Sequence, residues 1–169
     1  MQLILTADQI RQKIRRMAFQ IYEDNFDEPT LVLAGISGEG FVFAGRLANE
    51  LRAIAPFAIE LVMIRLDKTQ LAQPGISLMA PDGDSVVNLG GKVVIVIDDV
   101  LNTGRTLAFS LQPFLTVAVR KLQVAVLIDR NHPCYPVAAD YRGYALSTTL
   151  AEHVDVILSD PAREGVYLR

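Results

Sequence analysis

Short apolar runs that alternate with helical patterns constrain the fold of this chain most. Four such runs, rich in valine, isoleucine and leucine, span residues 30–34, 57–66, 93–97 and 122–128. Unbroken apolar runs of this kind are typical of strands buried on both faces, as in parallel sheets covered by helices. We therefore predict an α/β fold with a mainly parallel, twisted sheet and helices on both of its faces.

Apolar residues at helical spacing predict the elements between these strands. Thr6 and Gln9 have the pattern of a capping box, which would begin an amphipathic helix over residues 7–23. A second helical stripe spans residues 40–54. The apolar side chains of both helices are expected to form core or subunit contacts.

The second half of the chain is less regular. A third helix is expected to kink at Pro113, because proline lacks the backbone donor of a helix interior. Short strands are expected at residues 154–158 and 165–168. Residues 67–91 carry several proline and glycine turns and no sustained period, which is typical of a lid, a binding loop or a small hairpin.

Composition restricts the class of protein. A chain of 169 residues suits one domain, residues 1–169, and its 51% hydrophobic residues exclude a disordered chain. The net charge of −3 gives no bulk attraction to nucleic acid. Cys134 is the single cysteine, which excludes an internal disulfide and fits a reducing cytoplasm. No run approaches the roughly 18 apolar residues of a membrane span, so we expect a cytoplasmic protein without a membrane partner.

Two adjacent carboxylates, Asp98 and Asp99, follow the apolar run at 93–97 and precede the turn Asn-Thr-Gly-Arg-Thr at 102–106. Ligands of parallel sheets bind beyond the carboxyl ends of the strands. The turn's N–H groups and hydroxyls suit a phosphate, which Gly104 would let approach closely. Because carboxylates repel phosphate, the two aspartates are expected to accept hydrogen bonds from sugar hydroxyls or to hold Mg²⁺. The pattern therefore predicts a site for a phosphorylated sugar.

Residues 94–106, Val-Ile-Val-Ile-Asp-Asp-Val-Leu-Asn-Thr-Gly-Arg-Thr, resemble the phosphoribosyl pyrophosphate motif of the type I phosphoribosyltransferases. Residues 35–41 are similar to the pyrophosphate-binding loop of that family, and residues 127–133 and 139–144 extend the resemblance. Among its subfamilies, the chain looks most like the bifunctional pyrimidine operon attenuator and uracil phosphoribosyltransferase. The resemblance covers most of the chain, from about residue 10 to the end.

The resemblance implies a reaction and its site residues. A nucleobase nitrogen, most simply that of uracil, would displace pyrophosphate at C1 of phosphoribosyl pyrophosphate, with Mg²⁺ as cofactor. Residues 67–91 would form a flexible hood over the carboxyl ends of the strands. The catalytic residues would be Asp98, Asp99, Arg65 and Lys68, with both aspartates near the metal through ribose hydroxyls or water. The substrate-binding residues would be Ser37, Gly38, Glu39, Asn102, Thr103, Gly104, Arg105, Thr106, Arg130, His132, Arg142 and Tyr144.

These substrate-binding residues divide into three groups. The backbone of residues 37–39 would bind Mg²⁺-pyrophosphate, and residues 103–106 would cradle the 5-phosphate. Residues 129–144 would form the wall of the base pocket, with Arg142 or Tyr144 near the ring.

The sequence departs from the family pattern at three places. Glu39 stands where a basic residue is usual, and an anion there is unfavourable unless it points away or meets Mg²⁺. Asn102 replaces the aspartate that purine enzymes use as acid or base, which favours uracil over a purine. Residues 133–136, Pro-Cys-Tyr-Pro, replace the usual segment after the histidine.

Two alternatives stay open: a nucleotide-sensing RNA-binding regulator with little catalysis, and a 6-oxopurine phosphoribosyltransferase. The resemblance implies a basic surface that binds RNA, and the first helix carries a basic cluster, although such a cluster is more typical of a solvated helix face. Its members are Arg11, Lys13, Arg15 and Arg16. A homodimer or higher homo-oligomer is expected from the resemblance.

Overall fold

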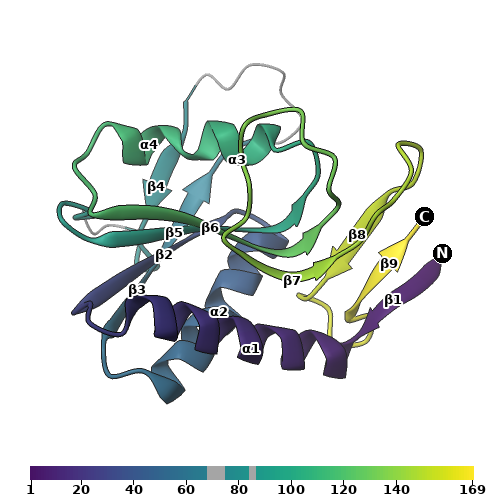
Figure 1. Cartoon of the computed structure of the whole chain (residues 1–169), viewed down its shortest axis with the longest axis horizontal. Helices are drawn as coiled ribbons and strands as arrows, with labels where there is room; N and C mark the ends of the chain where they lie inside the picture. Colours follow the sequence, from purple (N-terminus) through teal and green to yellow (C-terminus); the bar gives the residue numbers. More distant parts are fainter. Residues whose placement is uncertain (68–74, 84–86) are drawn as a thin grey trace.

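The computed structural model describes residues 1–67, 75–83 and 87–169 and contains two β-sheets (Figure 1). A six-stranded sheet has the order β4-β3-β2-β5-β6-β7, and a three-stranded sheet has the order β1-β9-β8. In chain order the elements are β1 (Gln2–Thr6), α1 (Ala7–Asn25), β2 (Thr30–Ile36), α2 (Glu39–Ile54), β3 (Ala58–Arg65), β4 (Ser77–Met79), β5 (Val93–Leu101), α3 (Arg105–Ser110), α4 (Gln112–Leu115), β6 (Lys121–Asp129), β7 (Tyr141–Ala145), β8 (Val154–Ile157) and β9 (Gly165–Leu168).

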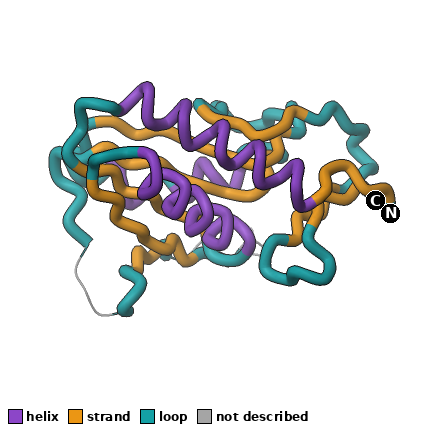
Figure 2. Tube along the Cα trace, turned by 90° about the horizontal axis from the view of Figure 1, so that it is seen from below, coloured by secondary structure: helices purple, strands orange, loops and turns teal. Residues whose placement is uncertain are grey.

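The large sheet is parallel from β3 through β2, β5 and β6 to β7, and only β4 is antiparallel to its neighbour. Helices α1 and α2 cross one face, where Figure 2 shows them side by side, and α3 and α4 cover the other face. The predicted α/β fold with a mainly parallel sheet is therefore confirmed.

Alternation along each buried strand supplies both halves of the core. In β2, Leu31 and Leu33 face α1 and α2, whereas Val32 and Ala34 face α3 and α4, and none of the four side chains is exposed to solvent. Because both faces are covered, each position along the strand gains from apolar burial, which explains the unbroken apolar run.

The helices begin and end where local chemistry requires. The predicted capping box is present, since the Gln9 N–H donates to Thr6 Oγ1 and the Thr6 N–H donates to Gln9 Oε1. The helix expected to kink at Pro113 instead ends at Ser110 and restarts at Gln112, with Pro113 in the first turn of α4. Proline is tolerated there because first-turn N–H groups have no partner within the helix.

The small sheet is formed by the two ends of the chain, which lie side by side in Figure 1. Its strands β8 and β9 match the strands expected at 154–158 and 165–168, and β8 contacts β5 of the large sheet. Strands β1, β4 and β7 were not predicted individually, because each is short and has no long apolar run.

The segment predicted as a hood, residues 67–91, contributes β4, which pairs with the carboxyl end of β3. Residues 68–74 and 84–86 of this segment, including Lys68, lie outside the described residues. Among the helices of the described chain, none is long and apolar enough to span a membrane.

Candidate active site

The acidic pair lies at the carboxyl end of β5, in the middle of the large sheet. Asp98 is 1% exposed and Asp99 is half-buried, so the strand presents the first carboxylate to the interior and the second toward the surface. Asp98 Oδ1 accepts a hydrogen bond from the Asp99 N–H (3.0 Å). Helix α2 approaches this pair closely, because a Cβ on Gly40 would lie 2.7 Å from Asp98 Oδ1. Only glycine fits at that position.

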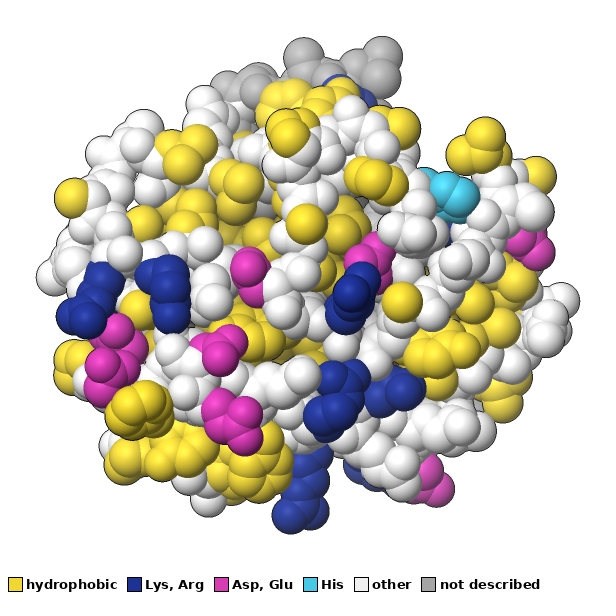
Figure 3. Space-filling view, in the orientation of Figure 1, with side chains coloured by type: hydrophobic (Ala, Val, Ile, Leu, Met, Phe, Trp, Pro, Cys, Tyr) yellow, Lys and Arg dark blue, Asp and Glu magenta, His cyan; other side chains and the backbone are white. Residues whose placement is uncertain are grey.

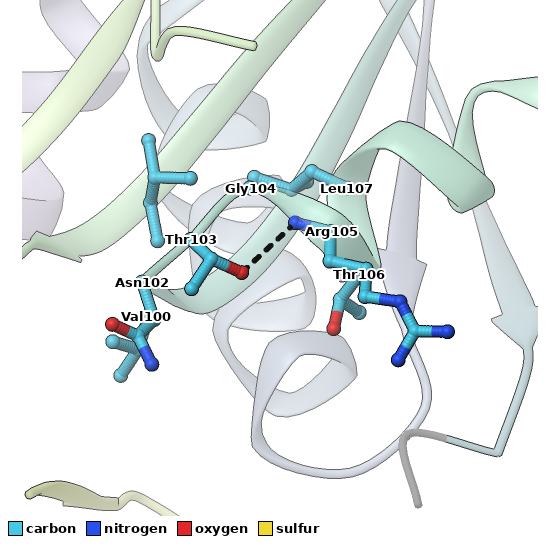
Figure 4. A pocket seen from close by; sticks show the side chains of 8 residues that line it. Val100, Asn102, Thr103, Gly104, Arg105, Thr106 and Leu107 are labelled. Carbon is cyan, nitrogen blue, oxygen red and sulfur yellow. Dashed lines mark hydrogen bonds between the residues drawn. The ribbon is translucent and has the colours of Figure 1, made fainter. Parts of the chain in front are cut away.

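The turn after β5 encloses a small cavity of about 110 Å³ that residues 100–107 line (Figure 4). Gly104 adopts φ +87°, a left-handed conformation that favours glycine, and this reverses the chain into α3. The Thr103 hydroxyl accepts a hydrogen bond from the Arg105 N–H, and the Thr106 hydroxyl borders the same space in Figure 4. The Arg105 guanidinium lies over the Phe109 ring. One contiguous stretch of sequence therefore builds an anion-sized cavity with hydroxyl and backbone groups.

A second cavity, of about 230 Å³, begins at the same turn and extends toward β6 and β7. Its wall combines polar groups with small apolar side chains: Leu101, Asn102, Asp129, Asn131, His132, Pro133, Val137, Ala138, Ala139 and Arg142. Leu101 and Asn102 line both cavities, so the two are neighbours. The Arg142 guanidinium donates to the Asp129 carboxylate (3.3 Å) and is more than half exposed.

The segment that departs from the family pattern, residues 133–136, packs on the turn after β5. The backbone N–H groups of Cys134 and Tyr135 both donate to Thr103 O, at 2.8 and 3.1 Å. The side chains of Tyr135 and Val137 lie beside Gly104. This segment therefore joins the walls of the two cavities.

Glu39 points away from the loop at residues 37–38. Its carboxylate accepts hydrogen bonds from the Leu158 N–H (2.9 Å), the Ser159 N–H (3.1 Å) and the Ser159 hydroxyl. The Ser37 N–H donates to Ile64 O, and Gly38 is exposed.

Arg130 and His132 lie at the end of β6, and both bind the segment that precedes β8. Arg130 is 4% exposed and donates to Thr148 Oγ1 and to the carbonyls of Thr149 and Glu152. His132 Nε2 is 2.5 Å from Thr148 O. The Thr149 N–H in turn donates to the Glu152 carboxylate, and this hydrogen bond lowers the pKa of Glu152.

The remaining predicted residues, Arg65 and Tyr144, line neither of these two cavities. Tyr144 is at the end of β7 outside the lining of either cavity, with the Lys13 ammonium 5.0 Å from its ring centre. Arg65 is an exposed residue at the carboxyl end of β3. The structure therefore brings residues 102–106 together around the first cavity and places Arg142 on the wall of the second, whereas Asp98 and Asp99 precede this turn in β5 and line neither cavity.

Comparison with known proteins identifies the protein family to which the chain belongs. The model of the phosphoribosyl transferase domain matches residues 3–160. The chain belongs to the phosphoribosyltransferase family. It is 34% identical over 165 residues to the bifunctional protein PyrR of Fusobacterium nucleatum, covering 95% of this chain and 92% of that protein. It is 38% identical over 165 residues to the bifunctional protein PyrR of Pelotomaculum thermopropionicum, covering 93% of this chain and 88% of the relative.

A solved structure shares the fold of this phosphoribosyltransferase. The hypoxanthine phosphoribosyltransferase of Trypanosoma cruzi superposes with a TM-score of 0.77 and 19% identity, covering 99% of this chain and 95% of that chain. The family expected from residues 94–106 is thus confirmed, and with it the type I fold.

Asp129 lines the second cavity of this phosphoribosyltransferase, and the sequence interpretation did not single it out. Its carboxylate is 11% exposed, lines the second cavity and binds Arg142. Like Asp98, it ends a continuously apolar strand, and this shared position was the signal available in the sequence.

The two carboxylates of Asp98 and Asp99 would suit a divalent cation whose other ligands are oxygens of the substrate and of water. Among the described residues, no group of three histidine, cysteine or acidic side chains could enclose a metal ion. Mg²⁺ commonly takes one or two carboxylates and completes its shell with water and substrate phosphates. Asp98 and Asp99 supply that number of carboxylates, so these two residues would suit a magnesium ion that is also held by substrate oxygens.

Proposed function

We propose that this phosphoribosyltransferase transfers the 5-phosphoribosyl group of phosphoribosyl pyrophosphate to uracil, forming UMP and pyrophosphate. The observation that carries the proposal is the pair of neighbouring cavities, a small one of about 110 Å³ and a larger one of about 230 Å³, that meet at Leu101 and Asn102. A nucleoside monophosphate has the same division, with a phosphate at one end and a planar ring at the other.

The residues divide the work of the reaction. Thr103 and Thr106 would bind the 5-phosphate, and Asp98 and Asp99 would accept hydrogen bonds from the ribose hydroxyls. The C1–oxygen bond to pyrophosphate breaks as the bond from C1 to the base nitrogen forms, and that nitrogen releases its proton to water or to an oxygen of the departing pyrophosphate. Because positive charge develops on the sugar, the carboxylates of Asp98 and Asp99 would stabilise the transition state electrostatically. A bound Mg²⁺ would neutralise the departing pyrophosphate.

The polar groups of the second cavity support a small base. Asn102 offers an NH₂ group that donates and a carbonyl oxygen that accepts, but it does not titrate, so it cannot act as the general base that a carboxylate in this place could be. Arg142, oriented by Asp129, presents donors that match the carbonyl oxygens of uracil. We therefore favour uracil over the 6-oxopurines.

A turnover assay tests this function. Purified protein is mixed with phosphoribosyl pyrophosphate, Mg²⁺ and, separately, uracil, hypoxanthine, guanine, xanthine or adenine, and the nucleotide formed is measured. We expect product with uracil, and none with uracil when Mg²⁺ is chelated. Product with hypoxanthine, guanine or xanthine and none with uracil would make a 6-oxopurine the substrate, and the assignment of the phosphate site would stand. An absence of product with every base would contradict catalysis.

RNA binding is a second candidate function, and the surface of α1 is the observation that favours it. Figure 3 shows lysine and arginine side chains gathered over α1 on this face. Arg16 donates to the carbonyls of Arg142 and Gly143, and Lys13 lies over Tyr144, so the basic surface is continuous with β7. RNA affinity that falls steeply with salt, and that weakens in Lys13→Ala, would support the regulator.

Location and assembly are part of the same proposal. We propose a cytoplasmic enzyme, on the grounds of its single exposed cysteine, Cys134, and a phosphorylated sugar substrate. We also propose a homodimer or larger homo-oligomer, which light scattering of the purified protein tests directly.

A further inference from the structure

We propose that Glu39 and Arg46 are positioning residues that hold the turn after β8 and thereby set the first turn of α2 against Asp98. The proposal rests on the proposed function, because it concerns how the chain binds phosphoribosyl pyrophosphate. In this proposal Glu39 holds the loop that is expected to bind pyrophosphate and does not itself contact pyrophosphate.

The two oxygens of Glu39 are both engaged by the turn after β8. Oε2 accepts from the N–H groups of Leu158 and Ser159, and Oε1 accepts from the Ser159 hydroxyl. These donors lie 119 and 120 residues away along the chain. A carboxylate that accepts three hydrogen bonds has its charge stabilised in place. Glu39 therefore presents no unsatisfied charge to an anion at residues 37–38.

Arg46 binds the same turn through a backbone carbonyl group. It lies seven residues after Glu39, two turns along α2 and on the same face of the helix. Its guanidinium donates to Leu158 O (2.9 Å) and to the Glu164 carboxylate (2.6 Å). The N–H and the C=O of Leu158, a residue only 2% exposed, are thus both bound by side chains of one helix.

The position of these contacts links them to the catalytic carboxylates. Glu39 is the first residue of α2 and follows Ser37 and Gly38 directly. The next residue, Gly40, lies so close to β5 that an added Cβ would meet Asp98 Oδ1 at 2.7 Å and Asp98 Cα at 3.1 Å. A shift in the first turn of α2 would therefore move the loop at 37–38 and the surroundings of Asp98 together.

Substitutions at residue 39 separate this role from simple charge repulsion. Glu39→Ala removes all three acceptor contacts, whereas Glu39→Gln keeps the geometry, since its carbonyl can accept from both N–H groups and its NH₂ can donate to the Ser159 hydroxyl. If Glu39 positions the loop, alanine impairs substrate binding and glutamine restores it. If Glu39 only repels pyrophosphate, both variants bind phosphoribosyl pyrophosphate more tightly.

The dissociation constant of Mg²⁺-phosphoribosyl pyrophosphate, measured by calorimetry on the full chain, is the primary test because it does not require turnover. We expect about a 10-fold weaker constant for Glu39→Ala and for Arg46→Met, and a constant within about threefold of the unmodified protein for Glu39→Gln. Ser159→Ala, which removes a single hydroxyl, is expected to weaken binding about two- to threefold. Glu50→Ala, on the same helix, is the matched control and should leave the constant unchanged.

Two further measurements make the outcome specific. Urea unfolding of each variant establishes that it is folded under the assay conditions, and if Glu39→Ala is not, Ser159→Ala and Arg46→Met carry the test. In turnover, KM for phosphoribosyl pyrophosphate should rise while KM for uracil stays constant, because the base cavity is lined by other elements. Unchanged or tighter binding in the folded variants would overturn the positioning role. A protein that binds phosphoribosyl pyrophosphate without turnover would contradict the proposed function alone.

Discussion

The turn at residues 102–106 and the loop at residues 37–39 occupy equivalent places but use their polar side chains in opposite ways. Each follows the carboxyl end of a buried central strand and leads into a helix. In the first, residues 100–107 line a cavity by themselves. In the second, the carboxylate of Glu39 is bound by Leu158 and Ser159 from the far end of the chain. A polar residue at a strand end therefore has a ligand-facing or a supporting role according to which distant segment reaches it.

The end of β6 combines both uses within a few residues. Asp129 lines the second cavity, Arg130 binds residues 148–152, and His132 does both, since it lines the cavity and contacts Thr148 O. The segment between β7 and β9 thus hydrogen-bonds several side chains that could otherwise have bound a ligand. Three experiments test this division and a fourth probes a region outside it, in order of decreasing expected effect.

Asp99→Asn tests the ligand-facing group most strongly. Removing the charge from a carboxylate expected to face ribose hydroxyls and Mg²⁺ should lower kcat/KM for phosphoribosyl pyrophosphate about 100-fold. The fold should be unaffected, because Asp99 is only half-buried. Steady-state kinetics with uracil and a circular dichroism spectrum measure both effects. Undiminished activity would show that the Asp99 carboxylate contacts neither the ribose hydroxyls nor the metal.

Arg130→Met tests the supporting group. The substitution removes a buried guanidinium that donates to Thr148, Thr149 and Glu152, so the free energy of unfolding should fall by about 2–4 kcal/mol. Arg142→Met is the matched control, since its side chain is more than half exposed, and it should lower activity with little loss of stability. Urea unfolding and turnover are measured for both. A loss of activity without a loss of stability in Arg130→Met, with the reverse in Arg142→Met, would contradict this assignment of roles.

Thr106→Val tests the phosphate contact. Valine keeps the shape of threonine but cannot hydrogen-bond, so the KM for phosphoribosyl pyrophosphate should rise about 10-fold. Thr116→Val makes the same replacement at an exposed position after α4 and should not change the KM. Equal effects of the two substitutions would show that the Thr106 hydroxyl does not contact the ligand.

Tyr141→Phe probes a third region, where β7 meets the end of α1, and should affect stability alone. The Tyr141 hydroxyl donates to the Asp24 carboxylate (2.8 Å), and its loss should lower the free energy of unfolding by about 1 kcal/mol. Burial, with the neighbouring Asp24 carboxylate, raises the pKa of Tyr141 well above its ordinary value.

This pKa shift gives the pH dependence its sign. Below about pH 10 tyrosine is protonated in the folded and unfolded chains, so the stability difference between the two proteins should be constant. Above about pH 10 the unfolded chain releases the proton that the folded chain keeps, and the advantage of the unmodified protein should shrink. Urea unfolding at pH 7, 9 and 10.5 measures this, and a difference that grows with pH would contradict it.

Much of the fold was predictable from local pattern. The runs at 30–34, 57–66, 93–97 and 122–128 became β2, β3, β5 and β6. The pattern is clearest in the central strands β2 and β5, because a strand covered on both faces gains from an apolar side chain at every position. The short edge strands β1, β4 and β7 carry no such pattern, since they depend on a neighbouring strand rather than on their own burial.

By itself, the sequence determined the parallel sheet, the acidic pair at the end of β5 and the turn at 102–106, all of which depend on residues close together in the chain. Tertiary structure alone decided that Glu39 points at Leu158 and Ser159, that Arg130 and His132 bind the segment before β8, and that Asp129 faces Arg142. The physical reason is that a side chain's partner is set by which backbone donors and acceptors are brought within hydrogen-bond distance, and for these residues most of those groups come from distant parts of the chain.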